Sequence, residues 1–415
     1  MTVRALRTHF ARVGFSPNSF TPDQEVEAAL RQIQHGEWCN NLGCTFASSR
    51  LSTKFGIIAR PRQIKRLLAR LDPEQHAKRK TTTARLGYVY TVAGPRSLYH
   101  CDAHEKLAKL WGFWFHLCID GYSRFILYLT VTDNKRSSTV GFIFVSACNH
   151  IGWASRVRWD RGKENVKAIQ AQWEHWWDDA LTQAENERRG SALTGRSMHN
   201  ARAEYIWAFV KKHVSGCFRT KFRRMEKELN ILDPSDARDL FCLHAVFISV
   251  IQSALDDFRD MWNNHMIRGV RTECGHGGGR PSELFLDPIG SASLLQRDDD
   301  FFYADPSEYG VDEPYKVDTA ELDIIEAPLQ DPLASWPSLQ TLRTAYFIAH
   351  PFHAVDPADD YLTFKLISLE LTLYCEHVSG GGNWDTFSSA RSPFFESQLW
   401  DLRCKLAALP CARSG

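Results

Sequence analysis

The sequence predicts an α/β protein in which helices flank a mixed five-stranded sheet. Three consecutive segments between residues 97 and 133 are rich in β-branched, aromatic and other apolar residues, and short turns separate them. From residue 137 to residue 218, helical and extended patterns alternate. Three adjacent strands followed by alternating helices and strands are typical of a mixed sheet covered by helices. The residues before position 95 have a helical pattern of their own.

The N-terminal segment, residues 1–94, is basic and helical. The first hundred residues contain 16 Lys and Arg against six Asp and Glu, a balance that suits nucleic acid. Helices are predicted at 22–36 and 60–74 from their capping signals and apolar periodicity. They form either a helix-turn-helix, whose basic second helix contacts DNA through Arg62, Lys65 and Arg66, or a solvated surface of no special role.

The central segment supplies the sheet. Strands are predicted at 97–102 and then at 112–120 and 124–133, where the turn "GYS" makes a hairpin. A helix at 137–153, opened by two serines, leads to a fourth strand at 155–160. The remaining pattern is helix, strand and helix, at 163–184, 191–195 and 200–218.

A long apolar stretch follows the predicted sheet. Residues 235–265 form one long helix or two, and their apolar run from Leu240 is interrupted by His244 and Gln252. The run is shorter than the roughly 18 apolar residues of a membrane-spanning helix, so we expect a buried helix and no membrane partner. Beyond residue 290 the chain is acidic and then partly helical near 392–409, and we assign this tail no chemistry.

Three acids stand at strand ends or helix starts within the central segment. Asp102 ends the first predicted strand, Asp160 ends the fourth, and Glu204 lies in the first turn of the helix that begins in "RSMHNARAEYIW". Carboxylates at strand ends converge at one edge of an α/β sheet. Three carboxylates without His or Cys suit Mg²⁺ or Mn²⁺. Two such ions can stabilise the attacking and leaving oxygens of a phosphoryl transfer. Each acid read alone is equally consistent with a cap or a surface charge.

Polar residues near these acids in sequence are candidates for gripping DNA phosphates, although each is also consistent with ordinary surface polarity. They are Lys106, Lys163, Asn165, Arg202 and Lys211. Asn200 is expected to be the N-cap of the helix that carries Glu204. Trp173, Trp176 and Trp177 are expected to be core residues, with base stacking as the alternative.

Residues 95–283 resemble the integrase core domain of retrovirus-like and transposon-encoded integrases, the DDE group with a ribonuclease-H-like fold. The matching stretches include "GPRSLYHCDAHEKL", "SRVRWDRGKENV" and "LTGRSMHNARAEYIW". The family's two Asp and one Glu fall on Asp102, Asp160 and Glu204. The flanks depart from the usual motifs: Cys101 replaces Ile, Lys163 replaces the second Gly, and Tyr205 replaces Arg.

The resemblance implies a metal-dependent DNA nucleotidyltransferase that cuts DNA ends and transfers strands. Asp102, Asp160 and Glu204 would be both its catalytic residues and its ligands for Mg²⁺ or Mn²⁺. The implied partners are element-end and target DNA and further copies of the chain, and the implied location is intracellular, in the nucleus. A catalytically inactive or domesticated DNA-binding protein is one alternative. A ribonuclease-H-type nuclease is another, although the helix at 137–153 lacks the acid that such enzymes carry there.

These observations divide the chain into three parts. Residues 1–94 form the basic helical segment, 95–290 the catalytic core with a helical extension, and 291–415 an acidic linker and tail. The 11 cysteines include no C-x-x-C pair, so we expect free thiols and neither a zinc module nor a disulfide framework.

Overall fold

The computed structural model describes most of the chain as far as residue 286. The described residues are 20–36, 38–74, 92, 94–160, 162–195, 200–268, 278–286 and 313–314. The tail predicted as an acidic linker and partly helical segment, apart from 313–314, lies outside them. Cysteines in the described part of the chain are all free thiols, as the sequence predicted.

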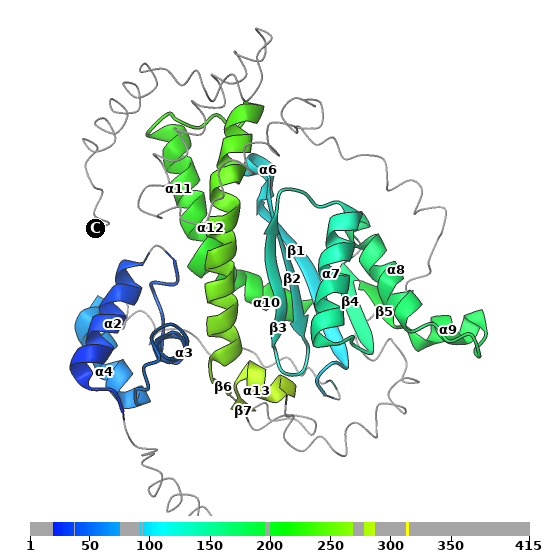
Figure 1. Ribbon diagram of the computed structural model, residues 1–415, viewed down its shortest axis with the longest axis horizontal. Coiled ribbons are helices and arrows are strands. Elements are labelled where there is room, and N and C mark those ends of the chain that lie inside the picture. The colour runs from blue at the N-terminus through cyan, green and yellow to red at the C-terminus, as the bar shows by residue number, and fades with distance from the viewer. Residues whose placement is uncertain are drawn as a thin grey trace, which may run out of the picture.

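A mixed sheet forms the centre of the molecule (Figure 1). Its strands lie in the order β3-β2-β1-β4-β5-β8. The first three pair antiparallel, β4 and β5 continue parallel to β1, and the two-residue β8 pairs with β5. The bounds are β1 Leu98–Leu107, β2 Phe113–Asp120, β3 Ile126–Thr132, β4 Arg156–Asp160, β5 Ala192–Gly195 and β8 Glu313–Pro314. The predicted five strands are confirmed, and β8 is an addition at the edge.

Strand β1 is longer than the sequence predicted. Its antiparallel pairing with β2 runs on to Leu107↔Phe113, whereas its parallel pairing with β4 covers only the residues from Leu98 to His100. The expectation that Asp102 ends the first strand is therefore wrong. The residue lies inside β1, just beyond the last residue that pairs with β4, and the sheet opens there.

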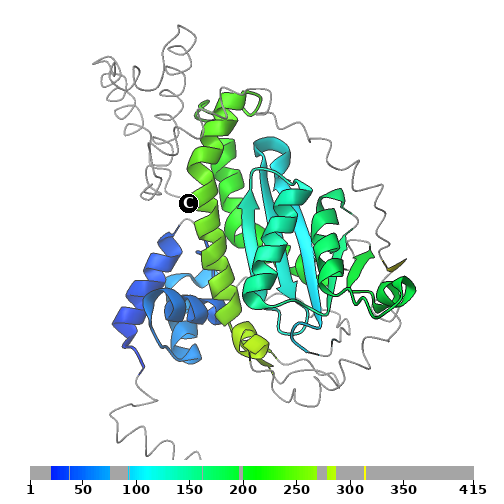
Figure 2. The same cartoon turned by 45° about the vertical axis from the view of Figure 1, so that its right-hand side comes forward.

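Two helical layers cover the sheet (Figures 1 and 2). One face packs against α7 and α8, and the other against α10, α11 and α12. The bounds are α6 Ala108–Trp111, α7 Ser137–Ile151, η1 Lys163–Asn165, α8 Val166–His175, α9 Gln183–Arg189, α10 Ala201–Val210, the π-helix η3 Lys211–Ser215, α11 Gly216–Lys227, α12 Ala237–Asn264 and α13 Pro281–Leu286. A separate two-stranded ladder joins β6 Ile267–Arg268 to β7 Gly278–Gly279.

The single helix predicted at 163–184 is wrong, because α8 ends at His175. The indole N–H of Trp176 donates to the carbonyl of Ala154 at 2.8 Å, and the side-chain amide of Asn186 donates to the carbonyl of Asp178 at 2.9 Å. These contacts favour a turn between α8 and α9. Trp173, Trp176 and Trp177 are half-buried, so the expectation that they are core residues is also wrong.

Helix α12 is the apolar helix predicted at 235–265, formed as one piece. It passes between the sheet and the N-terminal helices, and Phe247, Leu255 and Phe258 are fully buried (Figure 1). Among the helices of the described residues, only α12 is long and apolar enough, over Asp239–Asn264, to span a membrane by length and composition. Since 53% of its most apolar window is buried inside the protein, its apolar face is accounted for by core packing.

Within the described residues of the N-terminal segment, three helices form where the sequence predicted two. They are α2 Asp23–His35, α3 Cys44–Phe55 and α4 Pro61–Leu71. Helix α3 was not predicted, because its Ser- and Thr-containing sequence has little apolar periodicity. Its Ser49 hydroxyl donates to the carbonyl of Met261 in α12 at 2.8 Å. Helices α3 and α4 follow each other in the chain, with Gly56 at φ 64° in the turn between them; whether the segment is a DNA-binding helix-turn-helix stays a prediction.

The π-turn between α10 and α11 depends on a glycine. A Cβ atom on Gly216 would lie 2.5 Å from the backbone carbonyl oxygen of Lys211. We therefore expect Gly216→Ala to lower the free energy of unfolding by about 1–3 kcal/mol, as overpacking does, although alanine normally favours a helix. Urea denaturation measures the change. Gly43→Ala is the control, because the added Cβ atom meets nothing within 4 Å, and it should lower the free energy of unfolding by less than about 1 kcal/mol. If Gly216→Ala is as stable as the wild-type protein, the expectation is wrong.

Candidate functional site

The strand register brings two of the predicted acids together. In the parallel pairing of β1 with β4, Leu98 lies opposite Arg156 and His100 opposite Arg158. Two residues further along, the same register sets Asp102 against Asp160, the last residue of β4. Neighbouring strands lie about 4.8 Å apart, and side chains at the same level of two parallel strands point to the same face. Both carboxylates thus lie where the sheet opens.

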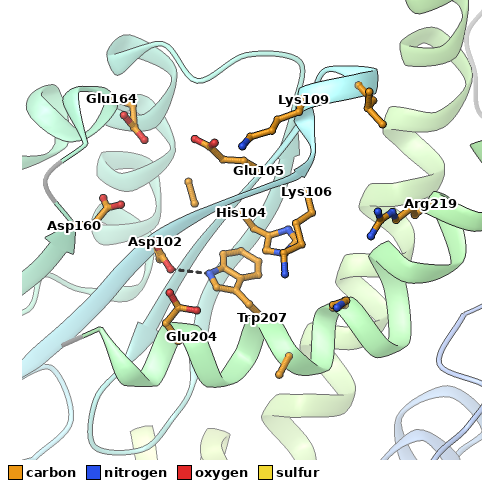
Figure 3. Close-up of a pocket in the computed structure, with 14 residues that line it drawn as sticks. Asp102, His104, Glu105, Lys106, Lys109, Asp160, Glu164, Glu204, Trp207 and Arg219 are labelled. Carbon is orange, nitrogen blue, oxygen red and sulfur yellow. Dashed lines mark hydrogen bonds between the residues drawn. The ribbon is translucent and has the colours of Figure 1, made fainter. Parts of the chain in front are cut away.

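Glu204 reaches the same opening from α10. The helix is anchored on its other side by Ile206 and Val210, which are fully buried in the core. The amide of Glu204 donates to the carbonyl of Asn200 at 3.1 Å, so the acid stands in the first turn. Figure 3 shows the three carboxylates from β1, β4 and α10 facing one another across one cavity.

The cavity has a volume of about 970 Å³. Acidic residues line one side of it: Asp102, Glu105, Asp160, Glu164 and Glu204. Four cationic side chains also line the cavity: Lys106, Lys109, Lys211 and Arg219. Figure 3 shows Lys106, Lys109 and Arg219 on the side away from Asp160 and Glu164. An acidic half beside a basic half is the arrangement expected for a site that holds metal ions and a phosphate chain together.

The acidic half is electrostatically unfavourable without a cation. Burial, followed by the charges of Asp160 and Glu204, raises the pKa of Asp102 to about 7, although a hydrogen bond from Trp207 acts in the opposite direction. Burial also raises the pKa of Asp160, against a hydrogen bond from Asn165. A bound divalent cation would remove this penalty, because it stabilises the ionised carboxylates.

The donor chemistry fits Mg²⁺ or Mn²⁺, since all the converging groups are carboxylate oxygens. No set of three His, Cys, Asp or Glu side chains within the described residues is close enough to hold a single ion. Magnesium commonly takes only one or two carboxylates from the protein and completes its shell with water and substrate phosphates. Asp102, Asp160 and Glu204 would thus hold such ions together with water and substrate phosphates.

Asn165 has a different role from the predicted phosphate contact. Its side chain is buried, and its Nδ2 donates to Oδ1 of Asp160 at 2.8 Å. A direct hydrogen bond to a DNA phosphate would need an exposed side-chain amide, and that of Asn165 is buried. The residue instead orients one of the three acids.

Asn200 occupies the N-cap position of α10, as predicted, but its side chain does not cap the helix. The side chain is turned toward β1, where Oδ1 lies 2.7 Å from Nδ1 of His100 and Nδ2 donates to the carbonyl of Cys101 at 2.8 Å. Burial lowers the pKa of His100 to about 3, so its imidazole is neutral at physiological pH.

The predicted basic residues fall into two groups. Lys106 and Lys211 line the cavity, whereas Lys163, exposed in η1, and Arg202 do not. Two cations of the cavity were missed. Lys109 lies three residues after Lys106, in α6 directly after β1, and this nearness in sequence was the available signal. Arg219 follows the π-turn, which no sequence pattern indicated.

The predicted DNA contacts of the N-terminal segment lie on α4, where Arg62, Lys65 and Arg66 are exposed. Arg66 forms an ion pair with Asp23 of α2. None of the three lines the carboxylate cavity. Their surface is thus separate from the site that the acids form.

Comparisons with known proteins bear on the family of the core. Residues 89–288 match the family model described as "Integrase core domain". A solved chain from the cryo-EM structure of a simian T-cell lymphotropic virus intasome in complex with PP2A regulatory subunit B56 gamma is similar at 14% identity, over 63% of this chain and 73% of that one, with a TM-score of 0.31. This structural similarity is weak, and the family of residues 89–288 rests on the family model. No curated protein matches.

Proposed function

The chain carries an integrase core domain over residues 89–288, and from this premise we propose that the protein is a DNA integrase or transposase that depends on two divalent metal ions. It would cut DNA ends and join them to a target. The observation that carries the proposal is the meeting of Asp102, Asp160 and Glu204 at one cavity whose opposite wall is cationic. The family is that of polynucleotidyl transferases, and the metal use and the activity are our proposal.

Asp102, Asp160 and Glu204 would hold the metal ions of the proposed site. When bound, Mg²⁺ or Mn²⁺ would supply positive charge to the attacking and leaving oxygens of an in-line displacement. Asn165 would keep Asp160 oriented, while Lys106, Lys211 and Arg219 would neutralise phosphates and fix the DNA end beside the acids.

The departures from the family motifs lie away from the cavity. Cys101 is buried among the residues that face α7 and α8, and Lys163 is exposed outside the cavity lining. The ring of Tyr205 packs against Phe209, at 5.0 Å between centroids, and Trp262, at 6.2 Å. These substitutions therefore leave the carboxylates undisturbed, which favours an active enzyme over a domesticated DNA-binding protein.

The proposed partners are the DNA of the element's ends, target DNA and further copies of this chain, and the proposed location is the nucleus. The exposed basic face of α4 supports a second DNA contact outside the catalytic cavity. Binding through such a face would weaken steeply with salt.

The proposed function predicts metal-dependent cutting and joining. Purified full-length protein would be incubated with labelled duplexes taken from the DNA that flanks its coding region, with a plasmid as target, and with Mg²⁺, Mn²⁺ or EDTA. We expect shortened and joined products only with Mg²⁺ or Mn²⁺. A band shift without products in either metal would favour the non-catalytic alternative, and no binding at low salt would exclude both.

The cationic wall predicts a specific loss of DNA affinity. We expect Lys211→Ala to weaken binding of the duplex and to reduce the slope of log affinity against log salt concentration by about one, because one phosphate contact is lost. Lys163→Ala removes a charge of the same kind outside the cavity and should change the slope little. Fluorescence anisotropy at several salt concentrations compares them, and equal slopes for the two variants would exclude the assigned role of Lys211.

A further inference from the structure

We propose that Asn200 and Trp207 are positioning residues that fasten α10 to β1 at two points flanking the Asp102 side chain, so that Asp102 and Glu204 are held ready for metal binding. The inference deepens the proposed function and rests on it. Asn200 and Trp207 stand at the start of and within α10, the helix that carries Glu204. Asn200 donates a hydrogen bond to β1 beside Asp102, and Trp207 donates one to Asp102 itself (Figure 3).

The first point of attachment is Asn200. Its side chain and that of His100 are buried, at 1% and 0% exposure. The carbonyl of Cys101 can only accept a hydrogen bond, so the amide nitrogen of Asn200 faces it. The amide oxygen then faces His100 and accepts from its Nδ1–H. The start of α10 is thus tied to the two residues of β1 that precede Asp102.

The second point of attachment is Trp207. Its Nε1–H donates to Oδ2 of Asp102 at 2.9 Å, and the residue is only 5% exposed. The ring of His104, two residues beyond Asp102, stacks on the indole with 5.0 Å between centroids. Phe115 stacks on His104 in turn, at 6.1 Å. The indole is therefore held by packing and fixes the orientation of the Asp102 carboxylate.

The spacing along α10 makes these contacts act together. Asn200, Glu204 and Trp207 stand at positions i, i+4 and i+7, which share one face of a helix. Glu204 lies between the two attachments, so its backbone is fixed relative to Asp102. A carboxylate that accepts one indole N–H keeps further lone pairs for a metal. Outer contacts of this kind commonly change metal affinity by 10–100-fold.

The test is the affinity of the full-length protein for Mn²⁺ alone, without DNA, measured by electron paramagnetic resonance. We expect Trp207→Phe, which keeps an aromatic ring and loses the N–H, to weaken Mn²⁺ binding by about tenfold. Trp38→Phe is the matched control, because Nε1 of Trp38 donates to Oδ2 of Asp257 at 3.0 Å, outside the cavity. It should leave Mn²⁺ affinity unchanged whatever it does to the unfolding temperature.

A second readout separates positioning from general stability. Strand transfer by Trp207→Phe at saturating DNA should be slow at low Mn²⁺ and recover as Mn²⁺ is raised, with the affinity for DNA unchanged. Asn200→Asp keeps the acceptor for His100 but sets a carboxylate against the carbonyl of Cys101, and it should also weaken Mn²⁺ binding. If that variant does not fold, the Trp207 result still decides.

The outcomes distinguish this inference from the proposed function. If wild-type protein binds no Mn²⁺, or if Asp102→Asn binds as much as wild type, the proposed metal site is wrong. If wild-type binding depends on Asp102 but Trp207→Phe and Asn200→Asp bind Mn²⁺ as tightly as wild type, the metal site stands and the positioning role is overturned.

Discussion

Replacing Asp160 by Asn is expected to lower the rate of strand transfer by about 10³-fold or more. A metal ion that stabilises transition-state charge contributes several kcal/mol, and each 1.4 kcal/mol is a tenfold change in rate. Asn keeps the size of Asp and can still accept the hydrogen bond that Asn165 donates to Oδ1 at 2.8 Å. Because burial raises the pKa of Asp160, a neutral amide there should not destabilise the fold.

The measurement is the amount of joined product per unit time with Mg²⁺ and with Mn²⁺, together with a thermal unfolding curve. Glu174→Gln is a suitable control, since Glu174 is exposed on α8 and its carboxylate accepts a hydrogen bond only from Gln170 among the contacts described for it. Joining by Asp160→Asn at the wild-type rate would show that the carboxylate assignment is wrong.

Removing the Asp257 side chain is expected to cost about 3 kcal/mol of unfolding free energy. The carboxylate Oδ2 lies 2.8 Å from Nη2 of Arg50, whose side chain is only 6% exposed, and it also accepts from Trp38. Asp257→Ala would leave the Arg50 charge buried without this partner, a change that typically costs 3–5 kcal/mol. The lower end applies because the Asp257 side chain is 31% exposed.

The same pair predicts a dependence of stability on pH. Burial acts to raise the pKa of Asp257, but hydrogen bonds from Trp38 and Arg50, and the charges of Arg50 and Lys54, lower it below its ordinary value. A carboxyl with a lowered folded-state pKa contributes stability above its unfolded pKa of about 3.9, and that contribution is lost as pH falls through the lower folded value.

Urea denaturation at pH 7 and at pH 3 checks both expectations. Asp257→Ala should lose stability at pH 7 and show a smaller further loss on acidification than wild type. Hydrogen exchange in α2 and α3 should rise, because Trp38 and Arg50 connect the N-terminal helices to α12. Asp260→Ala removes an exposed acid of the same helix, paired with Arg259 at 3.4 Å, and should change stability by less than about 1 kcal/mol. Equal losses in the two variants would exclude the proposed role of Asp257.

Much of the fold was predictable because its signals are local. The strands at Phe113–Asp120 and Ile126–Thr132 follow from period-two and β-branched patterns, and α7 and α10 follow from apolar periodicity and their boundaries. Helix α3 gave no such signal, because its stability comes from contacts with α12 such as the bond from Ser49 to Met261. The break after α8 was missed for the same reason, since it depends on Trp176 reaching Ala154.

The candidate site, too, was predictable only in part. Asp102, Asp160 and Glu204 could be named from the sequence, because the order of strands and helices already directs their backbone positions to one edge of the sheet. The sequence did not predict that Asn165 would donate to Asp160, or that the side chain of Asn200 at the N-cap would face β1. A polar residue near an acid can face solvent, a helix end or another strand, and only packing selects among these. Lys109 and Arg219 were missed because their helices adjoin the cavity only after the chain has folded.

The sequence by itself determined the order of the five central strands and the identity of the three acids, since both are recorded in residue type and spacing along the chain. Only the tertiary structure decided how far β1 extends, which side chains hold the acids, and which cations face them. The bonds from α10 to β1 join residues 99 to 105 positions apart. Contacts at that separation depend on how α10 docks on the sheet through Ile206 and Val210, which no local pattern encodes.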